Sequence, residues 1–361
     1  MAPEAQTLPR PGATPRRLAG TFRRDPDSGG SHKLQVATSL LAWAWLALVV
    51  VIWGLLKLAG DRWWPATLLT FGPRWLVLLP LLILIPAALL FQRRALVPLG
   101  VAALLGAGPV MGLCLTWSGL TGTLLVENLP IVRVVTYNAG EGGANVDRVC
   151  DFIGRSHPDV FVVDEWKNAA DDLLPHLGPS WHAAEHQMIA VFSRFPIRAV
   201  ERLGPDRFRK PWRAPALRCE LATPAGPIWV VGLHLDTPRE GLDAVRRSPW
   251  RAGAGMELMA TDRRHESELA SELAHLPGCA VIVAGDFNMP VDSAIYRRYW
   301  SGWQNAYSTV GLGYGLTKYT RLFGARIDHV LANDEWRVLA AQVGSHMGGD
   351  HRPLQVDLQR R

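Results

Sequence analysis

Residues 281–290 read V-I-V-A-G-D-F-N-M-P, an apolar run that passes directly into an acid and an amide. Residues 279–284 are rich in β-branched side chains and lie just before glycine and proline, which predicts a strand buried on both faces. Because residues two apart in an extended chain point the same way, Asp286 and Asn288 should project together. A carboxylate beside an amide suits a hydrolytic water and a phosphoryl oxygen, whereas an Asx turn that ends the strand is the structural alternative.

Strands and helices continue on both sides of this run, from residue 131 to the last residue. Apolar and β-branched patterns predict strands at 131–137, 159–163, 188–193, 217–221, 227–235, 326–331, 337–343 and 353–358. Other segments are expected to form helices at 145–157, 169–177 and 261–276, a hairpin turn at 224–226 and a long loop at 238–261. About ten strands with few helices favour an α/β fold of two packed sheets flanked by helices over a doubly wound parallel sheet.

The composition changes before residue 131. That part of the chain holds eleven Lys or Arg and five Asp or Glu, whereas the rest holds 27 of each, so the net charge of +6 lies entirely in the N-terminal third. Three apolar runs, at 36–56, 75–91 and 95–117, have about the length that crosses a bilayer. We therefore expect three transmembrane helices. A soluble domain of buried helices is the alternative, and three such runs so close together argue against it.

Basic residues set the expected orientation. Eight Lys or Arg lie before the first run or between the second and third, and three lie between the first and second. This bias predicts a multi-pass protein of the cell membrane with a cytoplasmic N-terminus and an extracytoplasmic C-terminal part. The expected organisation is a disordered basic cytoplasmic tail at 1–35, a membrane domain at 36–117, a linker at 118–130 and a C-terminal domain at 131–361.

Polar residues follow or end most of the predicted strands of the C-terminal domain. They are Asn138, Glu165, His234, Asp286, Asn288, Asp328, Asp350 and His351. Carboxylates and an amide are ligands for a hard divalent cation, and histidines and acids serve proton transfer and charge stabilisation. Each residue could end its strand without a further role, but their recurrence predicts one metal-assisted phosphoryl-transfer site.

These residues stand in the motifs T-Y-N-A-G, D-E-W, G-L-H-L-D, G-D-F-N, R-I-D-H and G-D-H-R-P. In this order and at these separations the motifs resemble the endonuclease/exonuclease/phosphatase superfamily, whose members include DNase I-like nucleases, inositol phosphatases and sphingomyelinases. The resemblance covers residues 131–361 and implies a four-layered α/β sandwich with two central β-sheets, preceded here by the three transmembrane helices. It also implies that this domain is a phosphoric ester hydrolase dependent on Mg²⁺ or Mn²⁺.

The resemblance implies the metal ligands. Glu165 would bind Mg²⁺ or Mn²⁺, with Asn138 and Asp350 in or near the coordination shell. One position departs from the family pattern, because several nucleases of the family carry an acid where this chain has Gly140. Metal binding would then depend more strongly on Glu165, and a nuclease assignment is weakened.

The resemblance also implies the catalytic roles. Asp286 would orient or deprotonate the attacking water, and Asn288 would hold a phosphoryl oxygen. His351 would stabilise the pentacovalent phosphorus, and Asp328 would fix the tautomer and charge of that imidazole. His234 would be a second donor to the phosphoryl or leaving oxygen. Together these roles describe in-line attack at phosphorus with preorganised donors.

Other residues carry weaker signals. The cluster R-F-R-K-P-W-R at 207–213 could bind the phosphate of a substrate through Lys210 and Arg213, or it could be a solvated loop. Three histidines are expected to be structural or solvent-facing: His265, His329 and His346. Cys114 is expected inside the third apolar run, and the sequence does not select a disulfide pair among Cys150, Cys219 and Cys279.

The combination predicts a membrane-anchored, metal-dependent phosphoesterase whose substrate is a lipid-linked or small phosphoester. The C-terminal domain is neutral, whereas a nonspecific nuclease usually needs a positive groove, and a tether near the bilayer concentrates the domain near lipids. An extracytoplasmic nuclease is one alternative, and a non-catalytic membrane protein that binds phosphate ligands is another. The expected partners are the bilayer and the substrate, and the sequence identifies no protein partner.

Overall fold

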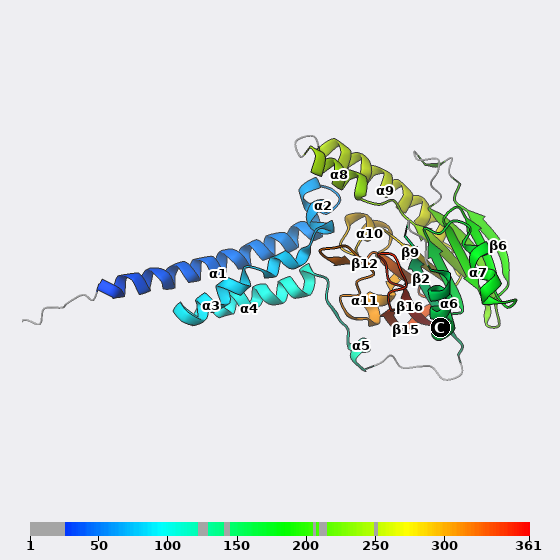
Figure 1. Cartoon of the computed structure of the whole chain (residues 1–361), viewed down its shortest axis with the longest axis horizontal. Helices are drawn as coiled ribbons and strands as arrows, with labels where there is room; N and C mark the ends of the chain where they lie inside the picture. Colours follow the sequence, from blue (N-terminus) through cyan, green and yellow to red (C-terminus); the bar gives the residue numbers. More distant parts are fainter. Residues whose placement is uncertain (1–25, 122–128, 141–144, 205–206, 209–214, 249–251) are drawn as a thin grey trace, which may run out of the picture.

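A helical rod projects from one side of an α/β domain (Figure 1). The structure is a computed structural model and describes residues 26–121, 129–140, 145–204, 207–208, 215–248 and 252–361. The rod comprises residues 26–110, which we call the N-terminal helical segment, and the α/β domain is the C-terminal domain expected at 131–361. Residues 1–25, the larger part of the expected tail, lie outside the described residues.

The N-terminal helical segment contains the three apolar runs. The first run lies in α1 (Pro26–Leu58), and the short α2 (Trp64–Phe71) follows it. The second lies in η1 (Arg74–Leu78) and α3 (Leu81–Phe91), and the third begins in η2 (Arg93–Ala95), α4 (Leu96–Leu105) and η3 (Gly106–Val110). Three stretches are long and apolar enough to cross a membrane: Gly30–Leu58, Arg74–Phe91 and Arg93–Val110.

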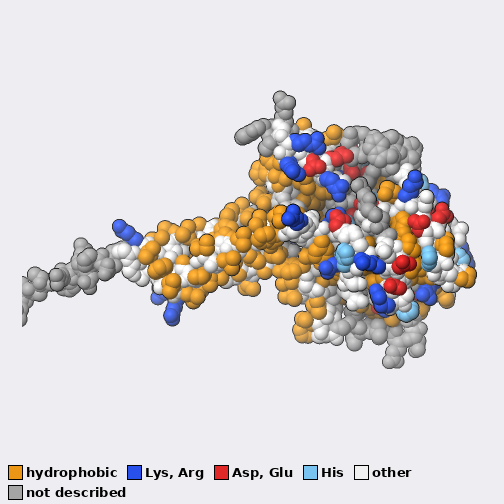
Figure 2. Space-filling model, viewed as in Figure 1, with side chains coloured by type: hydrophobic (Ala, Val, Ile, Leu, Met, Phe, Trp, Pro, Cys, Tyr) orange, Lys and Arg blue, Asp and Glu red, His pale blue; other side chains and the backbone are white. Residues whose placement is uncertain are grey.

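Apolar side chains cover the outside of this segment. Hydrophobic atoms line the rod along its length, and Lys or Arg side chains are seen at its far end (Figure 2). Leu82, Ile83, Leu90 and Leu104 are each more than 70% exposed. Monomeric soluble proteins rarely expose an apolar surface of this extent. The surface is suited to the hydrocarbon of a bilayer.

Two expectations for this part of the chain are corrected. Residues 26–35 are helical and belong to α1, so they are not part of a disordered tail. The third run leaves the helix before Gly112, whose φ is +79°, and does not stay helical to residue 117. Cys114–Leu115 instead form β1, which pairs with β11 (Leu312–Gly313). Cys114 therefore lies against the C-terminal domain, and all four cysteines are free. The expected linker contains α5 (Trp117–Thr121), and residues 122–128 lie outside the described residues.

Two six-stranded sheets form the centre of the C-terminal domain, in the orders β10-β14-β9-β8-β7-β6 and β15-β16-β2-β3-β5-β4. The strands of the first sheet are β6 (Ile197–Arg202), β7 (Ala216–Thr223), β8 (Gly226–His234), β9 (Val281–Asp286), β10 (Gln304–Asn305) and β14 (Asp328–Ala332). Those of the second are β2 (Ile131–Asn138), β3 (Val160–Asp164), β4 (His182–His186), β5 (Ile189–Ser193), β15 (Trp336–Val343) and β16 (Leu354–Arg360). A separate pair joins β12 (Lys318–Tyr319) to β13 (Gly324–Ala325).

Helices cover the outer face of each sheet, so the domain has four layers. The helices α6 (Val146–Ser156) and α7 (Ala169–Leu177) pack on the second sheet, and α9 (Ala252–Ala274) and α10 (Ala294–Tyr299) pack on the first. Strand β9 shows the consequence for one element. Ile282 and Ala284 join the core between the sheets, whereas Val281 and Val283 join the layer under α9. The predicted four-layered α/β sandwich is therefore confirmed, with β9 buried on both faces.

The expected long loop at 238–261 is wrong. Residues Arg239–Arg247 form α8, and α9 already begins at Ala252. Gly241 explains how α8 packs so closely on α9, because a Cβ at that position would lie 2.6 Å from the sulfur of Met259 and 2.7 Å from that of Met256. The short helix α11 (Ala306–Val310) packs against β15 of the second sheet and against β14 and β10 of the first, and its Ala306, Tyr307 and Val310 join the core between the sheets.

A substitution at Gly285, near the end of β9, tests whether the close approach of β9 to β8 requires glycine. Gly285 has a φ of +149°, and a Cβ there would lie 1.8 Å from the carbonyl oxygen of Leu233 on β8. We expect Gly285→Ala to lower the free energy of unfolding by about 2 kcal/mol or more, because the two strands would have to separate. Gly154→Ala in α6 is the matched control, since no atom lies within 4 Å of its Cβ position, and it should be neutral or stabilising. Thermal unfolding of the full chain in detergent checks this, and equal melting temperatures for the two variants would contradict it.

Candidate active site

Strands from both sheets end in polar residues at one edge of the sandwich. In the second sheet Asn138, the last residue of β2, pairs with Asp164, the last residue of β3. In the first sheet Asp286 at the end of β9 lies between His234 of β8 and Asp328 of β14. The register therefore brings together polar residues that are far apart in the sequence.

The buried amide of Asn138 joins the two sheets at this edge. Its Nδ2 donates to Oε1 of Glu165 at 3.0 Å and to Oδ2 of Asp286 at 2.9 Å. Its Oδ1 accepts a hydrogen bond from the backbone of Gly140 at 2.8 Å. The Nδ2 of Asn138 therefore orients two carboxylates, while its Oδ1 is bound to the backbone N–H of Gly140.

Asp286 and Asn288 form a turn and both line the pocket, so the alternative of an Asx turn is correct and the expected extension of the strand to Asn288 is not. The backbone N–H of Asn288 donates to Oδ1 of Asp286 at 2.7 Å, which is an Asx-type turn. Asn288 has a φ of +50°, and its Nδ2 donates to the carbonyl of Leu235 at 2.9 Å. The turn, and not continued extension of the strand, places both residues on the pocket wall.

His351 and Asp328 form a buried pair beside Asp286. Nδ1 of His351 lies 2.9 and 3.1 Å from the two carboxylate oxygens of Asp328, and its Nε2 lies 3.8 Å from Oδ2 of Asp286. Burial lowers the pKa of His351, but the charge and hydrogen bond of Asp328 outweigh it and raise the pKa to about 9. The imidazole is therefore held as a cation that points Nε2 toward Asp286.

Glu165 and His234 form a second pair, which joins the two sheets. Oε1 of Glu165 lies 3.3 Å from Nε2 of His234. Burial raises the pKa of Glu165, but the hydrogen bond and charge of His234, together with the Asn138 amide, lower it to about 2. Glu165 is thus ionised, and its φ of +57° turns the chain away from β3 at this residue.

Asp164 is a site residue that the sequence analysis missed. Its Oδ2 accepts the backbone N–H of Asp286 at 2.9 Å, so it fixes the end of β9 from the opposite sheet. Its Oδ1 is buried and has no hydrogen-bond partner among the described residues. Burial and the charge of Asp286 raise the pKa of Asp164 well above its usual value, and burial and the charge of Asp328 raise that of Asp286 to about 6. The only signal was its place before Glu165 in the motif D-E-W.

The donor atoms at this edge fit a divalent cation. One ligand atom from each of Glu165, His234 and Asp286 lies within 4.8 Å of the other two. Two of the three are carboxylates that share the Asn138 amide as a donor, and carboxylate oxygens are the ligands that hard cations prefer. Mg²⁺ or Mn²⁺ is therefore compatible with these residues, and Glu165 and Asp286 would hold it.

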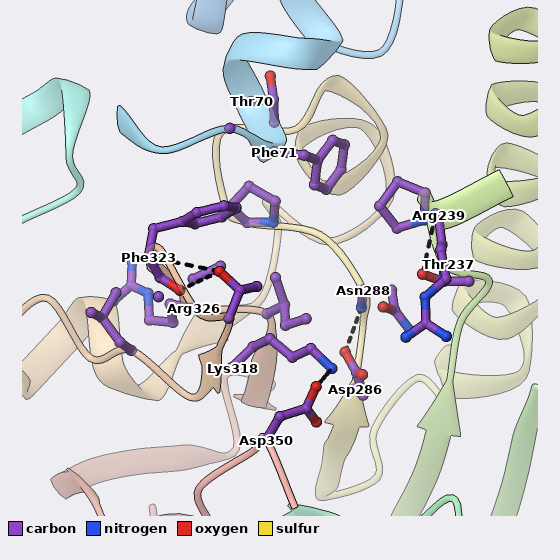
Figure 3. A pocket seen from close by; sticks show the side chains of 18 of the residues that line it. Thr70, Phe71, Thr237, Arg239, Asp286, Asn288, Lys318, Phe323, Arg326 and Asp350 are labelled. Atoms are coloured by element: carbon purple, nitrogen blue, oxygen red, sulfur yellow. Dashed lines mark hydrogen bonds and ion pairs between the residues drawn. The ribbon is translucent and has the colours of Figure 1, made fainter. Parts of the chain in front are cut away.

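A pocket of about 720 Å³ lies in front of these residues and reaches the N-terminal helical segment. One wall is the strand edge, with Glu165, His234, Asp286 and Asn288. Another wall is formed by the end of α2 and the start of η1, with Thr70, Phe71, Gly72, Arg74 and Trp75. Figure 3 shows Phe71 on the side of α2 and Asp286 and Asp350 on the opposite side, with Lys318 and Phe323 along the wall between them. The strand-edge end of the pocket is therefore polar, whereas the opposite end combines the aromatic Phe71 and Trp75 with Thr70 and Arg74.

The remaining predicted residues are only partly placed. Asp350 lines the pocket, but its Oδ2 lies 2.6 Å from Nζ of Lys318, a residue that the sequence analysis did not select. Lys318 had no signal in the sequence because it enters the pocket through the short strand β12. The predicted substrate ligands Lys210 and Arg213 lie outside the described residues.

Comparisons with known proteins identify the same region. A sequence model of the Endonuclease/Exonuclease/phosphatase family matches residues 135–351, more than half of the chain, and confirms the resemblance carried by the six motifs. A search of curated protein sequences gave no match.

Solved structures share the fold of the C-terminal domain. D. rerio TDP2 humanized by 14 mutations is 14% identical, over 63% of this chain and 98% of that chain, with a TM-score of 0.50. D. rerio TDP2 complexed with single strand DNA product is 12% identical over the same shares, also with a TM-score of 0.50. An endonuclease/exonuclease/phosphatase family protein from Bacteroides thetaiotaomicron is 16% identical, over 65% of this chain and 99% of that chain, with a TM-score of 0.48.

His329 lies beside the site and has a structural role. It is fully buried, its Nδ1 lies 3.2 Å from Nδ2 of Asn305, and its Nε2 lies 3.0 Å from the carbonyl of Met289. Burial lowers its pKa to about 3, so the ring is neutral and donates to Met289. His346 is exposed, and its Nε2 lies 3.0 Å from the carbonyl of Gly349. His265 is also exposed, and its Nε2 lies 3.0 Å from the carbonyl of Arg207.

The depressed pKa of His329 gives a pH dependence of stability. The folded state binds fewer protons than the unfolded state between about pH 3 and 6.5, so this contribution is complete above pH 6.5 and is lost as the pH falls. We expect His329→Gln to be less stable than wild type at pH 7 but to lose stability less steeply between pH 6.5 and 4.5, by up to about 1.4 kcal/mol per pH unit. Melting temperatures measured across this range test the prediction, and parallel curves for the two proteins would refute it.

Proposed function

Because the chain belongs to the endonuclease/exonuclease/phosphatase family, we propose that it is a membrane-anchored, metal-dependent phosphoesterase with an extracytoplasmic catalytic domain. Its substrate is a phosphate ester or pyrophosphate carried by a lipid. One observation supports this above all others. The pocket that contains Asp286 and Asn288 is lined on its other side by Thr70, Phe71, Gly72, Arg74 and Trp75, where the connection between the first and second apolar helices ends and the second helix begins.

The reacting groups are assigned from their contacts. Asp286 orients and deprotonates the attacking water. Burial and the charge of Asp328 raise the pKa of Asp286 to about 6 before a cation binds. Asn288, on the pocket wall next to it, holds a phosphoryl oxygen. His351, kept protonated by Asp328, stabilises the charge that develops on the phosphoryl group. His234 donates to the phosphoryl or leaving oxygen from the other side of Asp286.

The metal would be held by Glu165 and Asp286, with Asn138 orienting both carboxylates and Asp350 near the shell. When bound, Mg²⁺ or Mn²⁺ supplies positive charge to the phosphoryl oxygens in a site that contains several carboxylates. Lys318 adds a further positive charge on the same wall, where it is paired with Asp350. These side chains therefore favour a phosphate group bound at the polar end of the pocket.

The other end of the pocket supports a lipid substrate. Phe71 and Trp75 lie on this side, and Leu316 and Phe323 also line the pocket. Thr70, Arg74 and Arg326 are polar or charged residues that lie among them. The position of this end against the N-terminal helical segment suits an acyl or isoprenoid chain whose phosphate reaches Asp286. In addition, the C-terminal domain has 27 basic and 27 acidic residues, so no net positive charge attracts a polynucleotide.

The same arrangement supports the proposed orientation. The loop between α1 and α2 contacts the C-terminal domain, so the two lie on one side of the membrane if all three helices cross it. The eight basic residues on the other side favour the cytoplasm for that side. The catalytic domain would then face outward, with the lipid surface beside the pocket.

An extracytoplasmic nuclease is the second candidate, because a structure with the same fold holds a single strand DNA product. A non-catalytic domain that binds a phosphate ligand is a candidate of another class. Retention of the paired carboxylates, the His351–Asp328 pair and the amide at residue 288 favours catalysis over binding alone.

Asp286→Asn tests the enzymatic proposal. The full chain in detergent with Mg²⁺ should release phosphate or alcohol from a lipid-linked pyrophosphate or a phospholipid, and chelation by EDTA should stop the reaction. The variant should lose about 10²- to 10⁴-fold in kcat, because it cannot accept a proton. Asp147→Asn on the exposed side of α6 is the control and should match wild type. If wild-type protein is inactive on lipids, nucleotides and DNA alike, the enzymatic proposal is wrong and a non-catalytic domain that binds a phosphate ligand is favoured.

Phe323→Ala tests the lipid assignment. It should raise KM for a long-chain lipid phosphate by about tenfold, because the chain loses an apolar contact, while KM for a short-chain phosphoester changes less than about twofold. Leu322→Ala is the matched control, since Leu322 is 70% exposed and does not line the pocket. A DNA-cleaving activity that falls steeply with salt, with no lipid hydrolysis, would favour the nuclease.

A further inference from the structure

We propose that Asp61, in the loop between α1 and α2, positions Asn288 through the buried side chain of Arg263. The N-terminal helical segment would then complete the active site in addition to anchoring it. This inference concerns how the site is held in place, and its kinetic test rests on the proposed function. A second test, described below, does not depend on any activity.

Arg263 lies at the centre of the contact between the two parts of the chain. It projects from α9, and its side chain is 0% exposed. Its Nη1 lies 3.1 Å from Oδ1 of Asp61, its Nη2 donates to the carbonyl of Asn288 at 3.0 Å, and its Nε donates to the carbonyl of Asp236 at 3.1 Å. The guanidinium also lies 5.0 Å from the centre of the Phe71 ring. One side chain thus contacts the α1–α2 loop, the catalytic turn and the pocket wall.

Asp61 is itself held firmly in this position. Its side chain is 1% exposed, and it has a φ of +59°. Its Oδ2 accepts a hydrogen bond from the hydroxyl of Ser293, and its backbone N–H donates to Oγ1 of Thr67 at 3.1 Å. Two opposite charges therefore face each other away from water, each with additional hydrogen bonds. Removing one partner of such a pair leaves an uncompensated buried charge, which the protein must rehydrate by local rearrangement.

The rearrangement would reach Asn288 directly. Asn288 has a left-handed φ of +50°, which asparagine tolerates better than most non-glycine residues, and hydrogen bonds hold its position in the turn. Three hydrogen bonds do so: its N–H to Asp286, its Nδ2 to Leu235, and its carbonyl from Arg263. The bond from Arg263 is the one that leads to the N-terminal helical segment. If the guanidinium turns toward water, this bond is lost and the amide that faces the phosphate moves.

A second ion-pair cluster lies at the other end of residues 288–293. Asp292 accepts from Lys57 at 2.5 Å and from Arg74 at 2.8 Å, and Arg74 also donates to the carbonyl of Val110 at 3.1 Å. Arg297 donates to the carbonyls of Lys57 and Asp292. Lys57 is 43% exposed, so water replaces part of this cluster more easily than it replaces the Asp61–Arg263 pair. The N-terminal helical segment therefore contacts residues 292 and 293 directly, and it reaches Asn288 through Arg263 of α9.

The kinetic experiment uses the full chain in detergent with the substrate that wild type hydrolyses best. Asp61→Asn should lower kcat by about 10- to 100-fold with KM changed less than about threefold, and Asp61→Glu should recover part of the loss. Asp357→Asn is the matched control, because it breaks the ion pair with Arg133 at 2.6 Å on strand β16, away from the strand ends of the site. Its kcat should equal that of wild type. If Asp61→Asn behaves like this control, the proposal is wrong.

A double variant separates positioning from stability. Asp61→Asn combined with Arg263→Met removes both charges and leaves an apolar side chain in the junction, so the melting temperature should return close to that of wild type. The hydrogen bond to the Asn288 carbonyl is still missing, so kcat should stay low. Recovery of both quantities would show that the pair only stabilises the fold and would overturn the proposal. This comparison also decides the question if Asp61→Asn alone does not fold.

Hydrogen exchange supplies the readout that needs no activity. The amides of Phe287 and Asn288 donate to Ile327 and Asp286, and both should exchange faster in Asp61→Asn than in wild type. Amides of β9, such as that of Val283, should exchange at the wild-type rate. If no phosphoester is hydrolysed but the turn loosens as expected, the proposed function fails and the structural link stands. Unchanged exchange at residues 287 and 288 would refute the link itself.

Discussion

The hydrogen bonds from the Asn138 amide to Glu165 and Asp286 hold together two carboxylates that would otherwise repel each other across the sheets. This contact fixes how the ends of β3 and β9 face each other, and Asp164 reinforces it by accepting the backbone N–H of Asp286. The negative charge gathered there has two consequences. It makes a divalent cation compatible with the site, and it keeps His351 protonated through Asp328. The chemistry proposed for the domain therefore depends on how closely two sheets approach at one edge.

Much of this arrangement could be predicted from the sequence, for a physical reason. A strand buried on both faces needs a continuous apolar run, and a polar residue is tolerated only where that run ends. The change from Ala284 to Asp286 therefore located both the strand and the site residue. The same rule located Asn138, His234 and Asp328. The layers followed because strands of this kind require helices on their outer faces.

What the sequence did not reveal depends on contacts between distant residues. Asp61 and Arg263 are 202 residues apart, and each alone resembles an ordinary surface charge. Lys318 reaches the pocket from a two-residue strand that has no recognisable pattern. The sequence predicts a loop where the structure has helix α8, because the contact of α8 with α9 depends on a glycine, Gly241, and not on an apolar stripe. The third apolar run extends beyond the helix in the sequence because Cys114 and Leu115 are also apolar. In the structure these two residues form a strand that pairs with β11.

The contact between Asp61 and Arg263 also bears on how the protein is made. The ribosome synthesises residue 61 long before residue 263. The carboxylate of Asp61 is therefore without its partner Arg263 until the C-terminal domain has folded. If the helices insert as proposed, a chain in which the second or the third apolar helix failed to cross would leave the loop and the folded domain in different compartments. Such a molecule would lack the support for its catalytic turn. Correct biogenesis would therefore be a condition for hydrolysis, and the activity would arise only on the face of the membrane where both parts meet.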